Sequence, residues 1–171
     1  GIRENGGQYT HAAIWAIMAF AALRRNDLAW DLLSMINPVK HGDTSKGISK
    51  YKVEPYVIAA DVYANPQHIG RGGWTWYTGS AGWMYQLIVE KLLGLRLEID
   101  KLRFVTPCLP NDWKFFKLHY RYRETFYHIE FVVTGITGSI TRVFLDGIEQ
   151  ENRTVPLADD HKEHSAKVEI G

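Results

Sequence analysis

GRGGWTWYTGSAGW, residues 70–83, places five glycines and three tryptophans directly ahead of an apolar run. Residues 80–93 are rich in helix-forming side chains, and Gly94 stands where a C-terminal helix cap is expected. Thr78 or Ser80 would then be the N-cap of this helix. The stretch therefore predicts a helix whose entrance is lined by glycine and tryptophan.

The entrance of this helix suits a bound anion. First-turn N–H groups lack intrahelical partners and lie at the positive end of the helix dipole. Glycine lets a ligand approach the backbone closely, and tryptophan offers a flat apolar face with a polar edge. Serine and threonine caps are very common, so a capped helix without a ligand is the commoner meaning of such a short motif.

Composition favours a soluble protein without a nucleic-acid partner. The 171 residues carry 20 Lys and Arg against 19 Asp and Glu, a net charge of +1, and contain no long basic run. The apolar stretch at residues 12–23 is too short to cross a bilayer. Cys108 is the single cysteine, so an intrachain disulfide is excluded, and no other cysteine stands at the spacing of a metal site. Together with the short apolar stretch, this leads us to expect a soluble, cytoplasmic domain.

The first half of the chain has helical periodicity. Residues 12–24 are apolar nearly all round, as in a buried helix. Asp27 is expected to cap a second helix through residue 36, which Pro38 stops, and Pro55 to open a third over residues 56–63. The polar connection at residues 39–53 has no apolar period and is expected to be a long loop.

The second half alternates with a period of two. Strands are predicted at residues 117–123, 126–133, 140–145, 153–157 and 166–170. Asp146 and Gly147 form a strong hairpin-turn signal after the third of these strands. Residues 159–164, DDHKEH, are expected to be a solvated loop, and a metal role for its two histidines is rejected because no matching ligand cluster stands elsewhere.

Three blocks of the sequence together resemble one known family. They are IRENGGQYTHAAIW (residues 2–15), YKVEPYVIAADVY (residues 51–63) and GRGGWTWYTGSAGWMY (residues 70–85). In this order and at this spacing they resemble the C-terminal part of the inverting disaccharide phosphorylases. This is the cellobiose and chitobiose phosphorylase family, glycoside hydrolase family 94 or glycosyltransferase family 36. The form of the second block and the VFLDG turn look most like the C-terminal phosphorylase-like domain of cyclic β-1,2-glucan synthetases.

The resemblance implies an α+β architecture. Residues 1–100 would be about four C-terminal helices of an (α/α)6 barrel, and residues 101–171 an antiparallel β-sandwich-like module. The chain, which starts without Met, would then be a C-terminal fragment that needs the remainder of the parent barrel. Its exposed barrel surface would promote self-association. Attachment of the parent to the inner membrane through a synthase portion stays open.

The resemblance also implies an activity. The family cleaves β-glucosidic bonds with inorganic phosphate as co-substrate, inverts the anomeric configuration and releases α-glucose 1-phosphate, with no metal or organic cofactor. In inverting hydrolysis one carboxylic acid protonates the leaving oxygen and a carboxylate activates water. Phosphate is already a nucleophilic anion, so a cationic, hydrogen-bonding cradle takes the place of the base.

Carried over by position, the family's phosphate-binding residues fall on His11, Thr78 and Gly79. Its acceptor-sugar contacts fall on Arg3 and Glu4, and Arg3 stands where some relatives have Lys. The catalytic aspartate and a further phosphate-binding arginine belong to upstream motifs of the family. No catalytic residue is therefore expected in this chain, and the isolated fragment is expected to be inactive.

Each candidate residue has a plainer alternative. His11 would otherwise be a helix cap or a core histidine, and Arg3 with Glu4 an exposed ion pair of little energetic value. The aromatic candidates for sugar stacking would otherwise belong to the core; they are Trp74, Trp76 and Trp83.

The carboxylates of the first half are weaker candidates. Glu54 is retained as a substrate contact because Pro55 fixes the turn beside it. Asp61 and Glu90 lie within amphipathic runs, where a solvated or paired role is expected. No pair of carboxylates suited to an unrelated hydrolase is recognisable.

The sequence thus predicts the phosphate-binding half of a glycoside phosphorylase acting on a β-glucan, with a β-1,2-linked chain favoured and the linkage left open. The alternative is a non-catalytic carbohydrate-binding or interdomain module whose strands present Tyr120, Tyr122 and Tyr127 to a glycan or a neighbouring domain. Such alternation is more often simply one face of a sheet.

Overall fold

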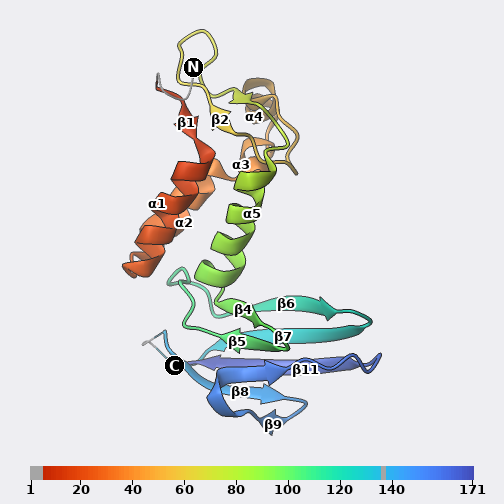
Figure 1. Ribbon diagram of the computed structural model, residues 1–171. Helices are drawn as coiled ribbons and strands as arrows, with labels where there is room; N and C mark the ends of the chain where they lie inside the picture. Colours follow the sequence, from red (N-terminus) through yellow and green to blue (C-terminus); the bar gives the residue numbers. More distant parts are fainter. Residues whose placement is uncertain (1–5, 136–137) are drawn as a thin grey trace. The chain divides into compact units, whose positions relative to one another are not determined.

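The computed structural model describes residues 6–135 and 138–171, and the chain divides into two compact units, Gly1–Ile88 and Val89–Gly171. Unit 1 is mainly helical and unit 2 contains two larger sheets, as Figure 1 shows. The expected α+β class is confirmed. The assignment of residues 1–100 to a barrel and 101–171 to a module stays a prediction.

Unit 1 contains five helices within the described residues, and α1 packs against α2 and α5. Their bounds are α1 (Thr10–Ala22), α2 (Asn26–Ile36), α3 (Pro38–His41), α4 (Ser45–Tyr51) and α5 (Thr78–Gln86), which continues as the π-helical segment η2 (Leu87–Leu92). The buried apolar side chains of α1 are Ile14, Ile17 and Ala21, spaced by three and four residues on one side. Trp15 on the same helix is half-exposed, so α1 is not buried all round as expected.

The connection at residues 39–53 is not the expected loop. It contains α3, whose first turn is capped by the Asn37 Oδ1, which accepts from the Val39 N–H at 3.0 Å, and α4. The Thr44 Oγ1 caps α4 by accepting from the Gly47 N–H at 3.1 Å. Local capping outweighs the missing apolar period here, because short helices depend on their caps.

The third helix expected at residues 56–63 does not form. Its last part is the strand β2 (Asp61–Val62), which lies between β1 (Gln8–Tyr9) and β3 (Gly72–Gly73) in an antiparallel sheet. The preceding backbone also pairs with distant residues: Ala60 N–H donates to the Trp74 carbonyl, and Tyr77 N–H to the Ile58 carbonyl. These non-local bonds replace the intrahelical ladder that Pro55 was expected to start.

Two expected helix caps are also wrong. Arg25 is the N-cap of α2, and Asp27 lies inside its first turn. Tyr77, rather than Thr78 or Ser80, is the N-cap of α5. At the other end, Gly94 has the positive φ of +78° expected of a residue that ends a helix.

Unit 2 contains two sheets. The first, in the order β10-β5-β4, joins β4 (Leu95–Glu98), β5 (Lys101–Phe104) and β10 (Thr154–Pro156); β4 and β5 were not expected from the sequence. The second, in the order β6-β7-β11-β8-β9, joins β6 (Phe115–Tyr122), β7 (Thr125–Val133), β8 (Ile140–Leu145), β9 (Ile148–Glu149) and β11 (Glu163–Ile170). Phe104 packs edge-on against Phe131, which links the two sheets.

The prediction that all strands of the β module are antiparallel is wrong for one strand pair. β11 pairs with β7 in parallel and with β8 antiparallel, so the larger sheet is mixed. Side-chain periodicity carries no information about the direction of a partner strand, and the chain between β7 and β11 is long enough for a crossover. The Asp146-Gly147 turn is confirmed, with positive φ at both residues as a type I′ hairpin requires.

The core of unit 2 is apolar and includes the free thiol of Cys108, which is buried. Its largest fully buried side chains are Tyr127, Phe104, Phe131, Leu92, Leu102, Ile129, Ile140 and Ile170. Among the described helices, none combines the length and the apolar character that crossing a membrane would require.

Candidate functional site

Two tyrosines hold the N-termini of α1 and α5 side by side. Tyr9 is the N-cap residue of α1 and Tyr77 that of α5, and their hydroxyl oxygens lie 3.1 Å apart in a hydrogen bond. Neither tyrosine caps its own helix through its side chain. The structure thus brings together two helix ends whose first-turn N–H groups receive no side-chain cap.

His11 lies in the first turn of α1 and faces α5. Its ring centroid is 5.9 Å from that of Trp83 on α5 and 4.6 Å from that of Trp15 on its own helix. The Nε2 atom is shielded from solvent and has no hydrogen-bond partner among the described residues. A buried polar atom of this kind calls for a partner such as a water or an ion.

The first turn of α5 carries the other expected anion ligands. Thr78 and Gly79 are exposed at its start. Ser80 is fully buried, and its Oγ also lacks a partner among the described residues. His11 on α1 and the Thr78-Gly79 pair on α5, which are far apart in sequence, therefore stand at the ends of neighbouring helices.

The glycines of the 70–83 stretch have different roles. A Cβ at Gly72 would collide with Val53 and Tyr51, and one at Gly73 with Tyr63 and Asp61. Gly70 has a φ of +82°, which few other residues adopt. Only Gly79 and Gly82 have open space where a Cβ would stand. Three of the five glycines thus serve the fold, and Gly79 leaves the backbone open beside the helix end.

The tryptophans divide in the same way. Trp74 and Trp76 are 71% and 63% exposed, and both have positive φ, at +40° and +59°. Such a backbone conformation is unusual for a bulky side chain, and it clusters at functional sites. Tyr56 contacts Trp76 edge-on, with ring centroids 6.1 Å apart. Trp83 is half-buried and contacts His11 instead.

The carboxylates lie in three different settings. Asp61 is buried in β2, in register with Tyr9, so the amphipathic helical run expected there is wrong and a solvated role is excluded. Glu54 is half-buried in a turn, where its carbonyl accepts from the Val57 N–H at 3.3 Å. Glu90 is half-buried in η2. The predicted sugar contacts Arg3 and Glu4 lie outside the described residues.

Sequence reasoning missed the two tyrosines and the burial of Ser80 and Asp61. One signal could have found the tyrosines, because the dipeptide Tyr-Thr stands at the start of both helices, as Tyr9-Thr10 and as Tyr77-Thr78. Such a local pattern does not show that the two tyrosines, 68 residues apart, form a hydrogen bond with each other.

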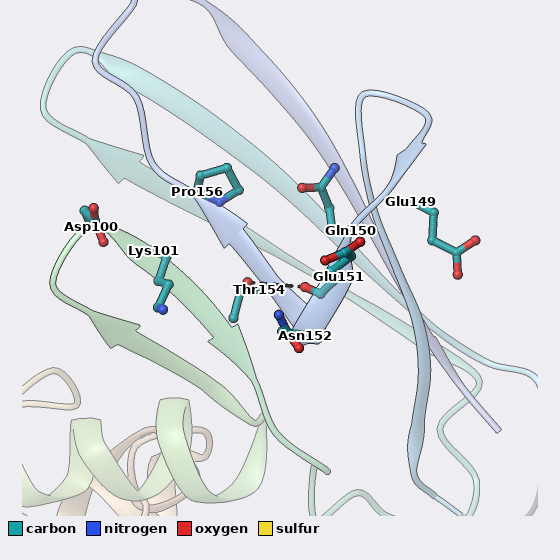
Figure 2. Close-up of a pocket in the computed structure, with 8 residues that line it drawn as sticks. All are labelled: Asp100, Lys101, Glu149, Gln150, Glu151, Asn152, Thr154 and Pro156. Carbon is teal, nitrogen blue, oxygen red and sulfur yellow. Dashed lines mark hydrogen bonds between the residues drawn. The ribbon is translucent and has the colours of Figure 1, made fainter.

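A concave region lies in unit 2, apart from the residues predicted to bind phosphate. It is a polar hollow of about 530 Å³, and Figure 2 shows its lining residues: Asp100, Lys101, Glu149, Gln150, Glu151, Asn152, Thr154 and Pro156. The Glu149 carboxylate is bonded to the Arg142 guanidinium at 2.7 and 3.1 Å. No aromatic side chain lines this hollow, so it offers hydrogen bonds but no stacking platform to a sugar.

The expected loop at residues 159–164 is shorter than predicted, because Glu163 and His164 already belong to β11. The His164 Nδ1 lies 2.7 Å from the Asp146 Oδ2, and its Nε2 lies 3.2 Å from the Asp160 Oδ1. The hydrogen bond to Asp146 is the main cause that raises the pKa of His164 above its usual value. Both ring nitrogens are thus engaged by carboxylates, and the described residues contain no group of three or more His, Cys, Asp or Glu suited to a metal ion.

Tyr127 cannot act as a surface contact. It is 1% exposed, its hydroxyl accepts from the Ala158 N–H at 2.7 Å, and its ring stacks on His164. Tyr120 and Tyr122 are half-buried on β6. The alternative in which strand tyrosines bind a glycan therefore loses Tyr127.

Comparison with known proteins gives one family. A model described as "Glycosyl hydrolase 94 superfamily, catalytic domain" matches residues 1–94. Cyclic beta-(1,2)-glucan synthase NdvB of Rhizobium meliloti (strain 1021) is 44% identical over 156 residues, covering 86% of this chain and 6% of that protein. N,N'-diacetylchitobiose phosphorylase of Vibrio proteolyticus is 30% identical over 160 residues, covering 92% of this chain and 20% of that protein.

A third relative is solabiose phosphorylase of Paenibacillus borealis, 29% identical over 99% of this chain and 22% of that protein. The chain thus spans less than a quarter of the length of each of these three curated relatives. Among solved structures, a family GH92 alpha-mannosidase from Bacteroides thetaiotaomicron covers 95% of this chain and 17% of its own, at 10% identity with a TM-score of 0.37. That likeness is too low to support an argument about the fold.

Proposed function

The chain belongs to the glycosyl hydrolase 94 superfamily, and on that premise we propose that it supplies the phosphate-binding half of a glycoside phosphorylase active site. His11, Thr78 and Gly79 would bind phosphate. Relatives that cover most of this chain are phosphorylases by name, which supports phosphate as the co-substrate.

One observation carries the proposal: two helix N-termini without side-chain caps stand together, beside a buried His11 Nε2 that lacks a partner in the described chain. A phosphate oxygen bound there would accept from first-turn N–H groups and from the imidazole, and the two helix dipoles would add to its stabilisation. Open space at Gly79 would let the anion reach the backbone.

The proposed reaction is inverting phosphorolysis. A phosphate oxygen attacks the anomeric carbon of a β-glucoside from the face opposite the leaving group. The glycosidic C–O bond breaks, and the leaving oxygen takes the proton of a carboxylic acid. The products are α-glucose 1-phosphate and the shortened sugar. We assign that acid to a part of the parent barrel upstream of this chain.

The substrate class we propose is a β-linked glucan, with β-1,2 linkages favoured by the 44% identity to a protein named cyclic beta-(1,2)-glucan synthase. Arg3, Glu4 and Glu54 are the proposed contacts to the acceptor sugar. Exposed Trp74 and Trp76 add flat apolar faces of the kind on which sugar rings stack.

The test is phosphate binding by the chain itself. Inorganic phosphate is titrated at constant ionic strength while tryptophan fluorescence is followed, because Trp15 and Trp83 both contact the His11 ring. His11→Ala should weaken binding by about tenfold to a hundredfold, the value of one hydrogen bond to a charged group at about 1.5–3 kcal/mol.

His68→Ala, at an exposed histidine of the same unit, is the matched control and should bind as the unaltered chain does. Equal phosphate affinity in the His11 and His68 variants would contradict the proposal. Detectable glucose 1-phosphate formation by the chain alone would contradict the assignment of the acid to an upstream segment.

A second candidate function is a non-catalytic carbohydrate-binding or interdomain module, which the polar hollow of unit 2 supports. Titration with β-1,2-glucooligosaccharides would separate the two. Binding that persists in His11→Ala but is lost in Asn152→Ala would favour the module. Binding that needs phosphate and His11 would favour the phosphorylase.

A further inference from the structure

A pair of histidines bridges β6 and β7 in unit 2. His119 and His128 are direct partners in the antiparallel register, and β6 and β7 run side by side in Figure 1. Their Nδ1 atoms lie 2.6 Å apart, and their rings are nearly perpendicular, with centroids 4.8 Å apart. At that distance one Nδ1 carries a proton and the other offers its lone pair.

A carboxylate on a neighbouring strand lies beside the pair and bears on which histidine offers the lone pair. The Glu163 Oε2 on β11 lies 3.4 Å from the His128 Nε2. A carboxylate beside Nε2 favours the tautomer with the proton on that nitrogen, so the Nδ1 of His128 is left as the acceptor and His119 is the donor. Histidines that bind metals usually donate their other N–H to such a carboxylate.

The two Nδ1 atoms are close enough to reach one ion after small movements of their rings. With bonds of about 2.0–2.1 Å, neighbouring ligands of a square-planar ion stand about 2.9 Å apart and those of a tetrahedral ion about 3.4 Å apart. The observed 2.6 Å is the length of an N–H···N hydrogen bond and is shorter than either value, so both rings must turn and move slightly apart before their Nδ1 lone pairs meet at one ion. Square-planar coordination by nitrogen is typical of Cu²⁺ and Ni²⁺, and Cu²⁺ binds such ligands most tightly.

The neighbouring cations on β6 are already paired with acids. Lys117 and Arg121 flank His119 on the same face of the strand. The Lys117 Nζ lies 3.3 Å from the Glu130 Oε1, and an Arg121 guanidinium nitrogen lies 2.9 Å from the Glu124 Oε1. Their charges are thus partly compensated, which lowers the electrostatic penalty for bringing a divalent ion to the pair.

We propose that His119 and His128 form a two-histidine site for a square-planar divalent cation, Cu²⁺ or Ni²⁺, with Glu163 as the positioning carboxylate. Binding shifts the His119 proton from Nδ1 to Nε2, so both Nδ1 lone pairs reach the ion. Water completes the coordination, since Glu163 stays at the His128 Nε2 and the described residues contain no group of three or more His, Cys, Asp or Glu suited to a metal ion. The site joins adjacent strands and is independent of the phosphate site.

The test uses the full chain with Cu²⁺ as the probe. One equivalent should give an electron paramagnetic resonance spectrum with two nitrogen ligands and should raise the thermal unfolding midpoint. His119→Asn and His128→Asn should each lose both effects. Glu163→Gln should keep the two-nitrogen spectrum but bind Cu²⁺ about tenfold to a hundredfold more weakly, as loss of an outer carboxylate typically does.

His161→Asn, at an exposed histidine of the same unit, is the matched control and should leave Cu²⁺ binding unchanged. The pair is on an exposed face, so its variants are expected to fold, which circular dichroism checks. A two-nitrogen spectrum that survives in His119→Asn, or Cu²⁺ affinity unchanged by Glu163→Gln, would overturn the proposal. If a histidine variant unfolds, the Glu163→Gln affinity alone decides.

Discussion

Gly79 is the residue at which the proposed phosphate site is most open. It lies in the first turn of α5, and beyond its chain neighbours and its own helix backbone nothing lies within 4 Å of the point where its Cβ would stand. Gly82, in the same helix, has the same open surroundings. The two glycines therefore differ in their distance from the helix end but not in the local packing that a methyl group would meet.

Gly79→Ala should reduce phosphate affinity by about tenfold or more, because the added methyl keeps the anion from the first-turn N–H groups, each worth about 1.5–3 kcal/mol to a charged acceptor. Gly82→Ala should leave phosphate affinity unchanged. Both variants should be at least as stable as the unaltered chain, since alanine is the better helix former by up to about 1 kcal/mol. Fluorescence titration and urea unfolding measure the two effects, and equal affinities in the two variants would exclude Gly79 from the site.

The link between Tyr9 and Tyr77 shows how single residues decide what an element can do. Each is the N-cap of a helix, yet their hydroxyls bond each other and leave the helix ends without a side-chain cap. A Ser or Asp at either position would satisfy first-turn N–H groups internally. The first turns of α1 and α5 therefore receive no side-chain cap, although the Thr10 N–H of α1 donates to the Ala60 carbonyl at 2.9 Å.

At the scale of elements, the change from η2 to β4 depends on Gly94. Its φ is +78°, and a Cβ there would collide with the backbone carbonyl of Val105. Gly147, in the β8–β9 turn, also has a positive φ, of +83°, but open space around it. Substitution at Gly147 would therefore introduce backbone strain alone, whereas substitution at Gly94 would add a steric clash to the same strain.

Gly147→Ala should destabilise unit 2 by about 1–2 kcal/mol, the cost of a left-handed conformation for an L-residue. Gly94→Ala should cost more than that, because the same strain adds to a clash with rigid backbone. Chemical unfolding followed by circular dichroism measures both. A smaller loss for Gly94→Ala than for Gly147→Ala would show that the 94–105 contact relaxes freely.

Stability of the β8–β9 turn should depend on pH through His164, which joins Asp146 on the turn to Asp160. Hydrogen bonding to Asp146 raises the pKa of His164, and bonding to His164 lowers the pKa of Asp146. For Asp160, burial opposes the shift, but the bond to His164 leaves its pKa lowered. The His164 contribution is complete below its unfolded pKa of about 6.5 and is lost as pH rises through the higher folded value.

The carboxylates also stabilise the fold, but their contribution depends on pH in the opposite direction. It is complete above the unfolded aspartate pKa of about 3.9 and is lost as pH falls through the lower folded value. The network should therefore stabilise unit 2 most between about pH 4 and pH 6.5. Urea midpoints measured from pH 4 to pH 9 should decline on the alkaline side, and His164→Gln should flatten that decline. An unchanged profile in His164→Gln would show that the network contributes nothing to the pH dependence.

At the scale of the whole molecule, unit 1 exposes many large apolar side chains. Those at least half exposed are Trp15, Leu23, Met35, Val39, Ile48, Tyr56, Ile69, Trp74, Trp76 and Tyr85. Apolar surface on this scale usually marks an interaction surface. The expectation is that the chain self-associates through unit 1.

Sedimentation velocity across a concentration series should show a rising average mass, and Leu23→Lys with Met35→Lys should return the chain to the monomer. Phe115→Lys, at an exposed apolar residue of unit 2, is the matched control and should leave association unchanged. A monomer at every concentration would contradict the expectation.

The sequence by itself determined the family, the α+β class and the strands of the larger sheet. These features depend on local sequence signals. The signals are three sequence blocks in a fixed order, side chains that alternate with a period of two, and an Asp146-Gly147 turn whose own residues adopt the positive φ that it requires. The short helices α3 and α4 also begin at local signals, the capping side chains of Asn37 and Thr44. They were not predicted because these residues have no apolar helical period.

Only the tertiary structure decided the rest, because the partners involved lie far apart along the chain. Asp61 became a strand residue through pairing with Tyr9 and Gly73, and β11 ran parallel to β7 although its side chains alternate as in any strand. The same holds for the helix entrance at residues 70–83. Packing against Tyr51, Val53, Asp61 and Tyr63 requires glycine at positions 72 and 73, whereas Gly79 in the first turn of α5 has open space beside it.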